Sequence, residues 1–161
     1  MVLAAADLPF RPPMGLAREQ LVPDRPLRLL VVDDHQPIRE VLALLLRDEG
    51  FEVQEAADGL AALAVLKRWP ADLILLDLMM PIMDGWEFLE AQRAISGVAR
   101  IPVIVLSASR VLSQRELRAP EGVAVLPKPF DFQLVVKTIR RLLYPRSRRQ
   151  PAPRRGLETP L

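Results

Sequence analysis

Polar side chains capable of chemistry follow four short apolar runs in this chain. They are Asp33 and Asp34, then Asp77, Ser107 and Lys128. Three carboxylates in one pocket repel each other at neutral pH, so they need either raised pKa values or a cation. Mg²⁺ prefers carboxylate, water and phosphate oxygens, and a lysine or a hydroxyl can bind the oxygens of a phosphoryl group. The set therefore predicts a magnesium-dependent site that handles a phosphoryl group.

Asp77 is the candidate nucleophile of this set. An aspartate beside a metal ion can attack phosphorus and form an acyl phosphate. Positioning and charge neutralisation do most of the catalytic work in such a transfer. Ser107 is a poor candidate for a hydrolase nucleophile, because the sequence has no Gly-x-Ser-x-Gly turn and places no base for it.

The elements that must position these residues alternate between strand-like and helix-like patterns. The strand-like runs are 29–32, 51–55, 73–76, 101–106 and 123–126. A helix after the first run has an apolar stripe of Ile38, Val41, Leu42 and Leu45. The alternation predicts an α/β fold, with a doubly wound, five-stranded parallel sheet and helices on both faces. The carboxyl ends of the strands then meet at one edge, which brings the polar residues together.

The ordered set of motifs resembles the response-regulator receiver family over residues 27–144. The matching segments are Asp33-Asp34, Asp77 with Met80-Pro81-Ile82-Met83-Asp84-Gly85, Ser107-Ala108, and Lys128-Pro129-Phe130. The resemblance implies a CheY-like domain with the flavodoxin-like strand order 2-1-3-4-5. It also implies a stand-alone receiver of a bacterial two-component system, and it permits a cis peptide before Pro129.

The resemblance assigns a role to each acidic residue. Asp77 is the phosphoacceptor and a metal ligand, Asp34 is a direct ligand, and Asp33 acts through water. The backbone carbonyl of Met79 completes the protein ligands of Mg²⁺, for which Mn²⁺ is a substitute. We interpret Asp84 as a helix cap, and His35, the single histidine, as a solvated loop residue.

Ser107 and Lys128 are expected, by the same resemblance, to contact the phosphoryl oxygens. The chain has three lysines among its 22 basic residues, and one of them stands at the position that the family requires. The phosphoryl donor is a histidine kinase or a histidine phosphotransfer protein. The chain is therefore expected to be a signalling protein, with no enzyme activity beyond its own phosphorylation and dephosphorylation.

Two positions, Val125 and Met79, and one segment are unusual for the function that the resemblance implies. Val125 stands where the family usually has an aromatic residue that moves together with the hydroxyl of Ser107, so the switch is expected to use Ser107 and backbone motion. Residues 108–121, in a face commonly used for output, have little apolar pattern. Met79 offers no polar group to orient water, which predicts slow self-dephosphorylation.

The two ends of the chain differ from the predicted domain. Residues 1–26 and 145–161 are rich in proline and lack periodicity, which predicts disordered tails. Five arginines fall in the last 16 residues, and without them the chain is mildly acidic. Contact with nucleic acid is therefore expected only through this tail. The sequence has no cysteine, signal peptide or membrane span, and a cytoplasmic protein is expected.

The output of the protein stays open at this point. The 17 residues from Pro145 onward are too few for an output domain. We therefore expect signalling through an unknown downstream protein, onward transfer of the phosphate, or a phosphorylation-dependent homodimer. Two alternatives remain: a phosphate-independent adaptor, which Val125 favours, and a Mg²⁺-dependent phosphohydrolase that uses Asp77 covalently but lacks a second acid at position 79.

Overall fold

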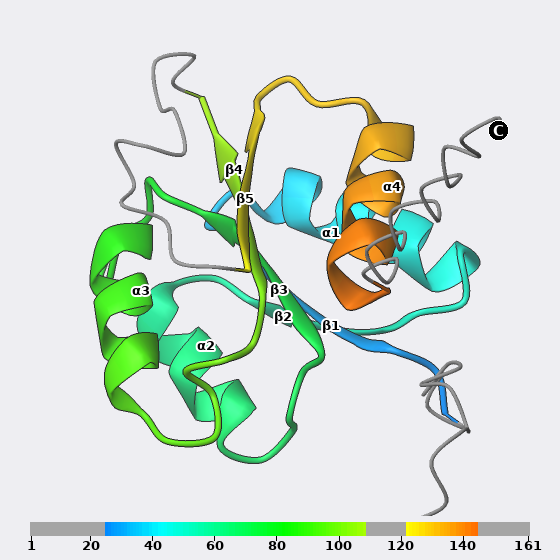
Figure 1. Ribbon diagram of the computed structural model, residues 1–161. Coiled ribbons are helices and arrows are strands. Elements are labelled where there is room, and N and C mark those ends of the chain that lie inside the picture. Colours follow the sequence, from blue (N-terminus) through cyan, green and yellow to red (C-terminus); the bar gives the residue numbers. More distant parts are fainter. Residues whose placement is uncertain (1–24, 109–121, 145–161) are drawn as a thin grey trace, which may run out of the picture.

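A five-stranded parallel sheet forms the centre of the protein, for which the computed structural model describes residues 25–108 and 122–144. The predicted C-terminal tail, residues 1–24 of the predicted N-terminal tail and residues 109–121 of the poorly patterned segment lie outside the described residues. The strands run in the order β2-β1-β3-β4-β5, which confirms the predicted order (Figure 1). Their bounds are β1 Arg28–Val32, β2 Glu52–Ala56, β3 Leu73–Asp77, β4 Val103–Ser107 and β5 Val123–Pro127.

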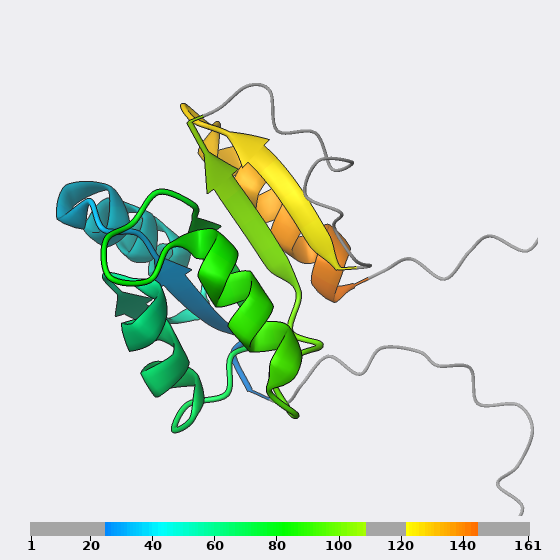
Figure 2. The ribbon, with the colours of Figure 1, turned by 90° about the vertical axis from the view of Figure 1, so that its left-hand side faces the viewer.

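Among the described residues, two helices cover each face of the sheet. The bounds are α1 Gln36–Asp48, α2 Gly59–Leu66, α3 Gly85–Ala94 and α4 Phe132–Leu143. Helices α1 and α4 pack on one face, and α2 and α3 on the other (Figures 1 and 2). Every residue of β3 and of β4 is buried, as expected for central strands covered on both sides. No helix within the described ranges is long and apolar enough to cross a bilayer.

Side-chain capping explains where α2 and α3 begin. The Asp58 carboxylate accepts the backbone N–H of Ala61 at 2.8 Å and starts α2. Asp84 and Glu87 form a reciprocal capping box at the start of α3, with donor–acceptor distances of 2.9 and 3.0 Å. The predicted capping role of Asp84 is thus confirmed, and α3 begins only a few residues beyond Asp77.

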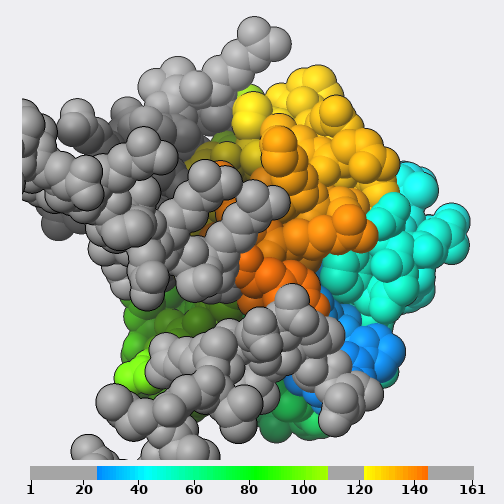
Figure 3. All heavy atoms as spheres, turned by 45° about the vertical axis from the view of Figure 1, so that its right-hand side comes forward, coloured from blue at the N-terminus to red at the C-terminus, as the bar shows by residue number. Residues whose placement is uncertain are grey.

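The predicted apolar stripe of α1 is only partly a core stripe. Leu42 is buried together with Leu46, but Ile38, Val41 and Leu45 remain 37, 57 and 37% exposed. These three residues lie on the flank of α1 that points toward α4, its neighbour on the same face of the sheet (Figure 3). A groove separates this flank from the start of α4, so the three side chains are covered neither by the strands nor by α4. The outer flank of the stripe therefore borders a groove, which is described below.

The loop between β3 and α3 is tightly packed where it leaves and enters the elements. A Cβ atom at Gly85 would lie 2.5 Å from the carbonyl oxygen of Asp77 and 2.7 Å from Cα of Leu78. The Gly85 N–H also donates to the Leu78 carbonyl at 3.0 Å. Helix α3 therefore begins directly against the strand end that holds Asp77, and only glycine allows this close approach.

Within the same loop, Ile82 has a φ of 70°, a left-handed conformation that costs a β-branched residue about 1–2 kcal/mol. Its side chain is 79% exposed, so replacing it loses little burial. We expect Ile82→Asn to raise the free energy of unfolding by about 1 kcal/mol, because asparagine tolerates this conformation. Urea denaturation measures the change. Ile82→Val, which keeps the β-branch, is the control, and an Asn variant no more stable than wild type would contradict the expectation.

Candidate functional site

Three carboxylates converge at the carboxyl edge of the sheet. Oxygens of Asp33, Asp34 and Asp77 all lie within 4.8 Å of one another. Strands β1 and β3 are parallel neighbours whose register pairs Val32 with Leu76, so the residues that follow these two meet. Asp33 is 1% exposed and Asp77 is 5% exposed, whereas Asp34 faces solvent. Two buried acids and one exposed acid thus share a single pocket.

Lys128 is the cation that faces these acids. Its Nζ donates to Oδ2 of Asp33 at 2.7 Å and to Oδ1 of Asp77 at 3.2 Å. The backbone holds the lysine in place, because its N–H donates to the Ser107 carbonyl at the end of β4 at 2.6 Å. The Lys128–Pro129 peptide is cis, as the sequence permitted. The lysine that follows β5 therefore reaches across β4 to the acids of β1 and β3.

The backbone of the turn after β1 donates a hydrogen bond to the other carboxylate oxygen of Asp33. Oδ1 of Asp33 accepts the backbone N–H of His35 at 2.9 Å, while Oδ2 accepts Lys128. His35 is the residue that precedes α1, and its backbone, not its imidazole, supports the site. Both oxygens of the most buried acid are therefore already engaged within the protein.

Burial is the largest influence on the acid–base properties of this pocket. It raises the pKa of Asp77, and Asp33 and Asp34 add to this, while Lys128 opposes it. Burial acts to lower the pKa of Lys128, but its hydrogen bond to Asp33 and the charges of Asp33 and Asp77 outweigh burial and raise it. Three carboxylates thus face one ammonium. An all-oxygen, acidic donor set of this kind suits a hard divalent cation such as Mg²⁺.

The remaining predicted residues lie at the same edge or below it. Ser107 is buried at the end of β4, where it pairs in register with Pro127. Met79 lies two residues beyond Asp77, with a side chain that is 74% exposed. Val125 is half-buried and packs on the side of the sheet covered by α2 and α3. Lys128 contacts Asp33 and Asp77 directly, while Ser107 ends the neighbouring strand β4 and Met79 follows Asp77 by two residues.

Sequence reasoning missed one contact of the turn after β1. The Arg39 guanidinium donates from Nη1 to the backbone carbonyl of Asp33 at 2.7 Å. Its Nε lies 3.5 Å from Oε2 of Glu55, and the Arg39 side chain is 14% exposed. An arginine in the first turns of an amphipathic helix usually indicates a solvated position, so no signal in the sequence distinguishes this one.

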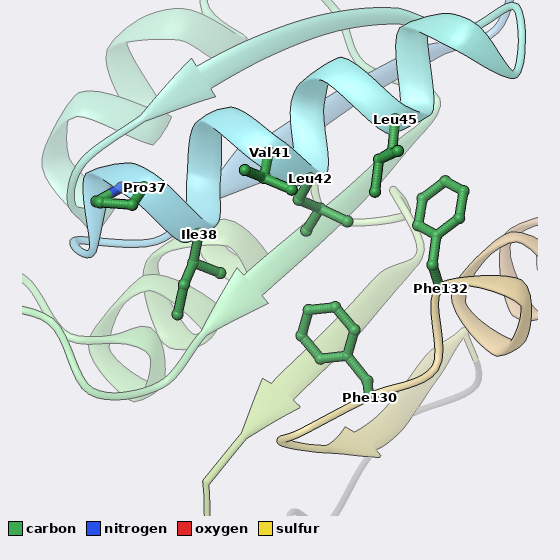
Figure 4. Close-up of a pocket in the computed structure, with 7 residues that line it drawn as sticks. All are labelled: Pro37, Ile38, Val41, Leu42, Leu45, Phe130 and Phe132. Atoms are coloured by element: carbon green, nitrogen blue, oxygen red, sulfur yellow. The ribbon is translucent and has the colours of Figure 1, made fainter.

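An apolar groove begins beside the acidic pocket. Helix α1 provides one wall, and two aromatic rings before and at the start of α4 face it across a space of about 380 Å³ (Figure 4). The lining residues are Pro37, Ile38, Val41, Leu42, Leu45, Phe130 and Phe132. Pro37 lies three residues after Asp34, and Phe130 lies two after Lys128. The groove therefore starts at the rim of the charged site.

The burial of Asp77 gives a testable consequence for stability in the absence of divalent metal. Because its pKa is raised in the folded state, ionised Asp77 destabilises the fold above that pKa, and no cost remains below about pH 3.8, where it is protonated in both states. We expect Asp77→Asn to raise the melting temperature at neutral pH and to lose this advantage as the pH falls through the raised pKa. Thermal denaturation across this pH range measures the difference.

The matched control is Asp58→Asn, because asparagine caps a helix as well as aspartate does and position 58 lies outside the acidic pocket. Its melting temperature should follow that of wild type across the same pH range. An Asp77→Asn variant that is less stable than wild type at neutral pH would show that the buried charge is fully compensated without metal.

Comparison with known proteins agrees with this geometry. The family model for the response regulator receiver domain matches residues 29–140. The chain is 35% identical to the response regulator MprA of Mycobacterium sp. (strain KMS) over 136 residues, covering 84% of this chain and 56% of that protein. It is 33% identical over 117 residues to the DNA-binding dual master transcriptional regulator RpaA of Synechocystis, covering 72 and 48%. The chain thus spans about half the length of these relatives.

Solved structures give the same result. The chemotaxis protein CheY4 of Vibrio cholerae superposes with a TM-score of 0.68 at 34% identity, covering 73% of this chain and 99% of that one. The receiver domain of a Pseudomonas aeruginosa sensor histidine kinase, with a magnesium ion coordinated in its active site cleft, gives 0.66 at 30% identity, covering 73 and 98%. With the strand order and the acidic pocket, these matches show that the chain belongs to the response regulator receiver domain family, a family of signalling proteins.

Proposed function

We propose that this chain accepts a phosphoryl group on Asp77 from a histidine kinase or a histidine phosphotransfer protein, with the help of Mg²⁺. The observation that carries the proposal is the cluster of three carboxylates that includes the buried Asp77, with Lys128 Nζ 3.2 Å from Oδ1 of Asp77. The phosphorylated form then signals through a phosphorylation-dependent protein contact or passes the group onward.

The positions of the acidic residues support direct metal binding by some of them and contact through water by another. Asp77 and the exposed Asp34 would bind Mg²⁺ directly, with the Met79 carbonyl as a further ligand. Both oxygens of Asp33 already accept hydrogen bonds, which favours contact through water. When bound, Mg²⁺ would neutralise the carboxylates and the charge on the phosphoryl oxygens.

The transfer itself uses one oxygen of Asp77 as the nucleophile. That oxygen forms a bond to phosphorus while the bond from phosphorus to the donor nitrogen breaks, and the leaving imidazole takes up a proton. Lys128 Nζ, which now donates to Asp77, would donate to a phosphoryl oxygen, and the hydroxyl of Ser107 would bind another. The acyl phosphate that results stores the signal.

The apolar groove supports a protein as the phosphoryl donor. A protein donor that presents a phosphorylated histidine to Asp77 must cover the rim of the pocket. Ile38 and Val41, 37 and 57% exposed, belong to the groove that begins at this rim. Burying such side chains against a partner would contribute to binding at roughly 25 cal/mol per Å² of apolar surface.

The residues beside the pocket bear on how the phosphorylated state would be passed to a partner. With Val125 in place of an aromatic residue, we propose that phosphorylation is reported by Ser107 and by the backbone around it. We propose residues 27–144 as the complete receiver unit. The chain covers 56% of the response regulator MprA and 48% of the transcriptional regulator RpaA, so regulation of transcription comes to this chain only as one candidate for its pathway.

Acetyl phosphate tests the central step. We expect the protein to gain one phosphoryl group when incubated with acetyl phosphate and Mg²⁺, because the small donor needs only the metal and Asp77. Intact-mass spectrometry measures the gain. Asp77→Ala should abolish it, while Asp84→Asn, outside the acidic cluster, should keep it. Wild type that stays unlabelled would favour a phosphate-independent adaptor, and turnover of a generic phosphate ester would favour a hydrolase.

The lifetime of the acyl phosphate depends on the residue two positions beyond it. Met79 has no polar group to orient an attacking water, and its side chain is 74% exposed, so a replacement can reach solvent without repacking. We expect Met79→Asn to speed self-dephosphorylation on the order of tenfold, less than the roughly 10²–10⁴-fold of a general acid or base, because asparagine orients water without transferring a proton. Loss of label after removal of acetyl phosphate measures the rate, with Met79→Leu as the control. Equally fast decay in wild type and the Asn variant would contradict this.

A further inference from the structure

Arg39 contacts the backbone of the acidic turn, the turn after β1 that carries Asp33 and Asp34. Its Nη1 donates to the carbonyl oxygen of Asp33 at 2.7 Å, while the N–H of Asp33 donates to the Ala56 carbonyl at 3.2 Å. The peptide groups on both sides of Asp33 are thus held, one by β2 and one by Arg39. The Arg39 side chain is only 14% exposed, whereas most arginines of folded proteins lie largely in solvent.

Glu55 holds Arg39 in this position. Its Oε2 lies 3.5 Å from Nε of Arg39, and its Oε1 accepts Nη2 of Arg47 at 3.0 Å. Arg47 also donates to the Val53 carbonyl of β2 at 2.9 Å, and its own side chain is 45% exposed. Two arginines of α1 therefore share one glutamate of β2, but only Arg39 extends to the acidic turn.

This contact has a mechanical and an electrostatic consequence. Three carboxylates within 4.8 Å repel each other, and this repulsion pushes the turn that carries Asp33 and Asp34 away from Asp77. Arg39 opposes that displacement by a charge-assisted hydrogen bond to the turn itself. It occupies no carboxylate oxygen, because it binds the backbone carbonyl of Asp33 instead.

We propose that Arg39 is a positioning residue of the cation site, which acts through the Asp33 carbonyl to keep the turn of Asp33 and Asp34 over Asp77. This rests on the proposed function, because it assumes that the acidic cluster binds Mg²⁺. Arg39 is neither a metal ligand nor a group that contacts the phosphoryl oxygens. Glu55 orients it.

The first measurement is Mg²⁺ affinity of the full chain by isothermal titration calorimetry. Residues that orient metal ligands from outside typically change metal affinity by about 10–100-fold when replaced. We expect Arg39→Met to weaken Mg²⁺ binding about tenfold, and Arg39→Lys, which keeps the charge and one donor, to recover part of the loss. Glu55→Gln should produce a smaller loss in the same direction.

Arg47→Met is the matched control. It removes an ion pair with the same glutamate and a hydrogen bond to a strand carbonyl, but it does not touch the acidic turn. We expect its Mg²⁺ affinity to stay within about twofold of wild type, since it orients no ligand. Thermal denaturation without metal shows whether each variant folds. If Arg39→Met does not fold, Arg39→Lys compared with Arg47→Lys makes the same distinction.

Acetyl phosphate labelling then separates positioning from chemistry. If Arg39 acts only on the metal site, the labelling rate of Arg39→Met falls at low Mg²⁺ and returns to the wild-type value at saturating Mg²⁺. A rate that stays low at saturation would assign Arg39 to the phosphoryl group and overturn the proposal.

Equal Mg²⁺ affinities of Arg39→Met, Arg47→Met and wild type would also overturn it, leaving Arg39 a role in stability alone. These outcomes differ from failure of the proposed function. Wild type that binds Mg²⁺ but stays unlabelled would refute phosphoryl transfer and leave the affinity comparison valid. Wild type that binds no Mg²⁺ would refute both.

Discussion

Mutual repulsion among three carboxylates is the constraint on which the site depends. Asp33 and Asp77 are buried at the ends of neighbouring strands, and Asp34 stands beside them. Water cannot screen the buried pair, so the protein must hold them together by other means. Lys128 does this by bridging both buried acids from the far side of β4. The sheet supplies the rigidity, since β3 and β4 are buried along their whole length.

The same sheet explains why the fold and the core of the site could be predicted from the sequence. Apolar runs that end in Asp33, Asp77 and Ser107 indicate parallel strands, and parallel strands bring their carboxyl ends to one edge. Burial of β1, β3 and β4 agrees with this, and the resemblance to receivers supplied the strand order. Capping by Asp58 and Asp84 was equally accessible, because it depends on residues three apart in the chain.

Other features depend on tertiary placement that local patterns do not carry. The stripe of α1 predicts an apolar face. It does not predict that a groove would separate this face from the start of α4 and leave Val41 largely exposed. Arg39 has the sequence context of a surface residue, and its contact with Asp33 depends on how the turn after β1 folds back on the helix. The positive φ of Ile82 could not be predicted either. Asparagine or glycine at this position would have indicated it, but isoleucine does not.

The close packing of Gly85 against Asp77 has an optical consequence. Because Gly85, the first residue of α3, has no side chain, the backbone at the start of α3 packs directly against the backbone of Asp77. Trp86 is the next residue, and it is 37% exposed, at the boundary between protein and water. Indole emission is sensitive to that boundary. The chain therefore carries an intrinsic fluorophore one residue beyond the glycine that packs against the backbone of Asp77.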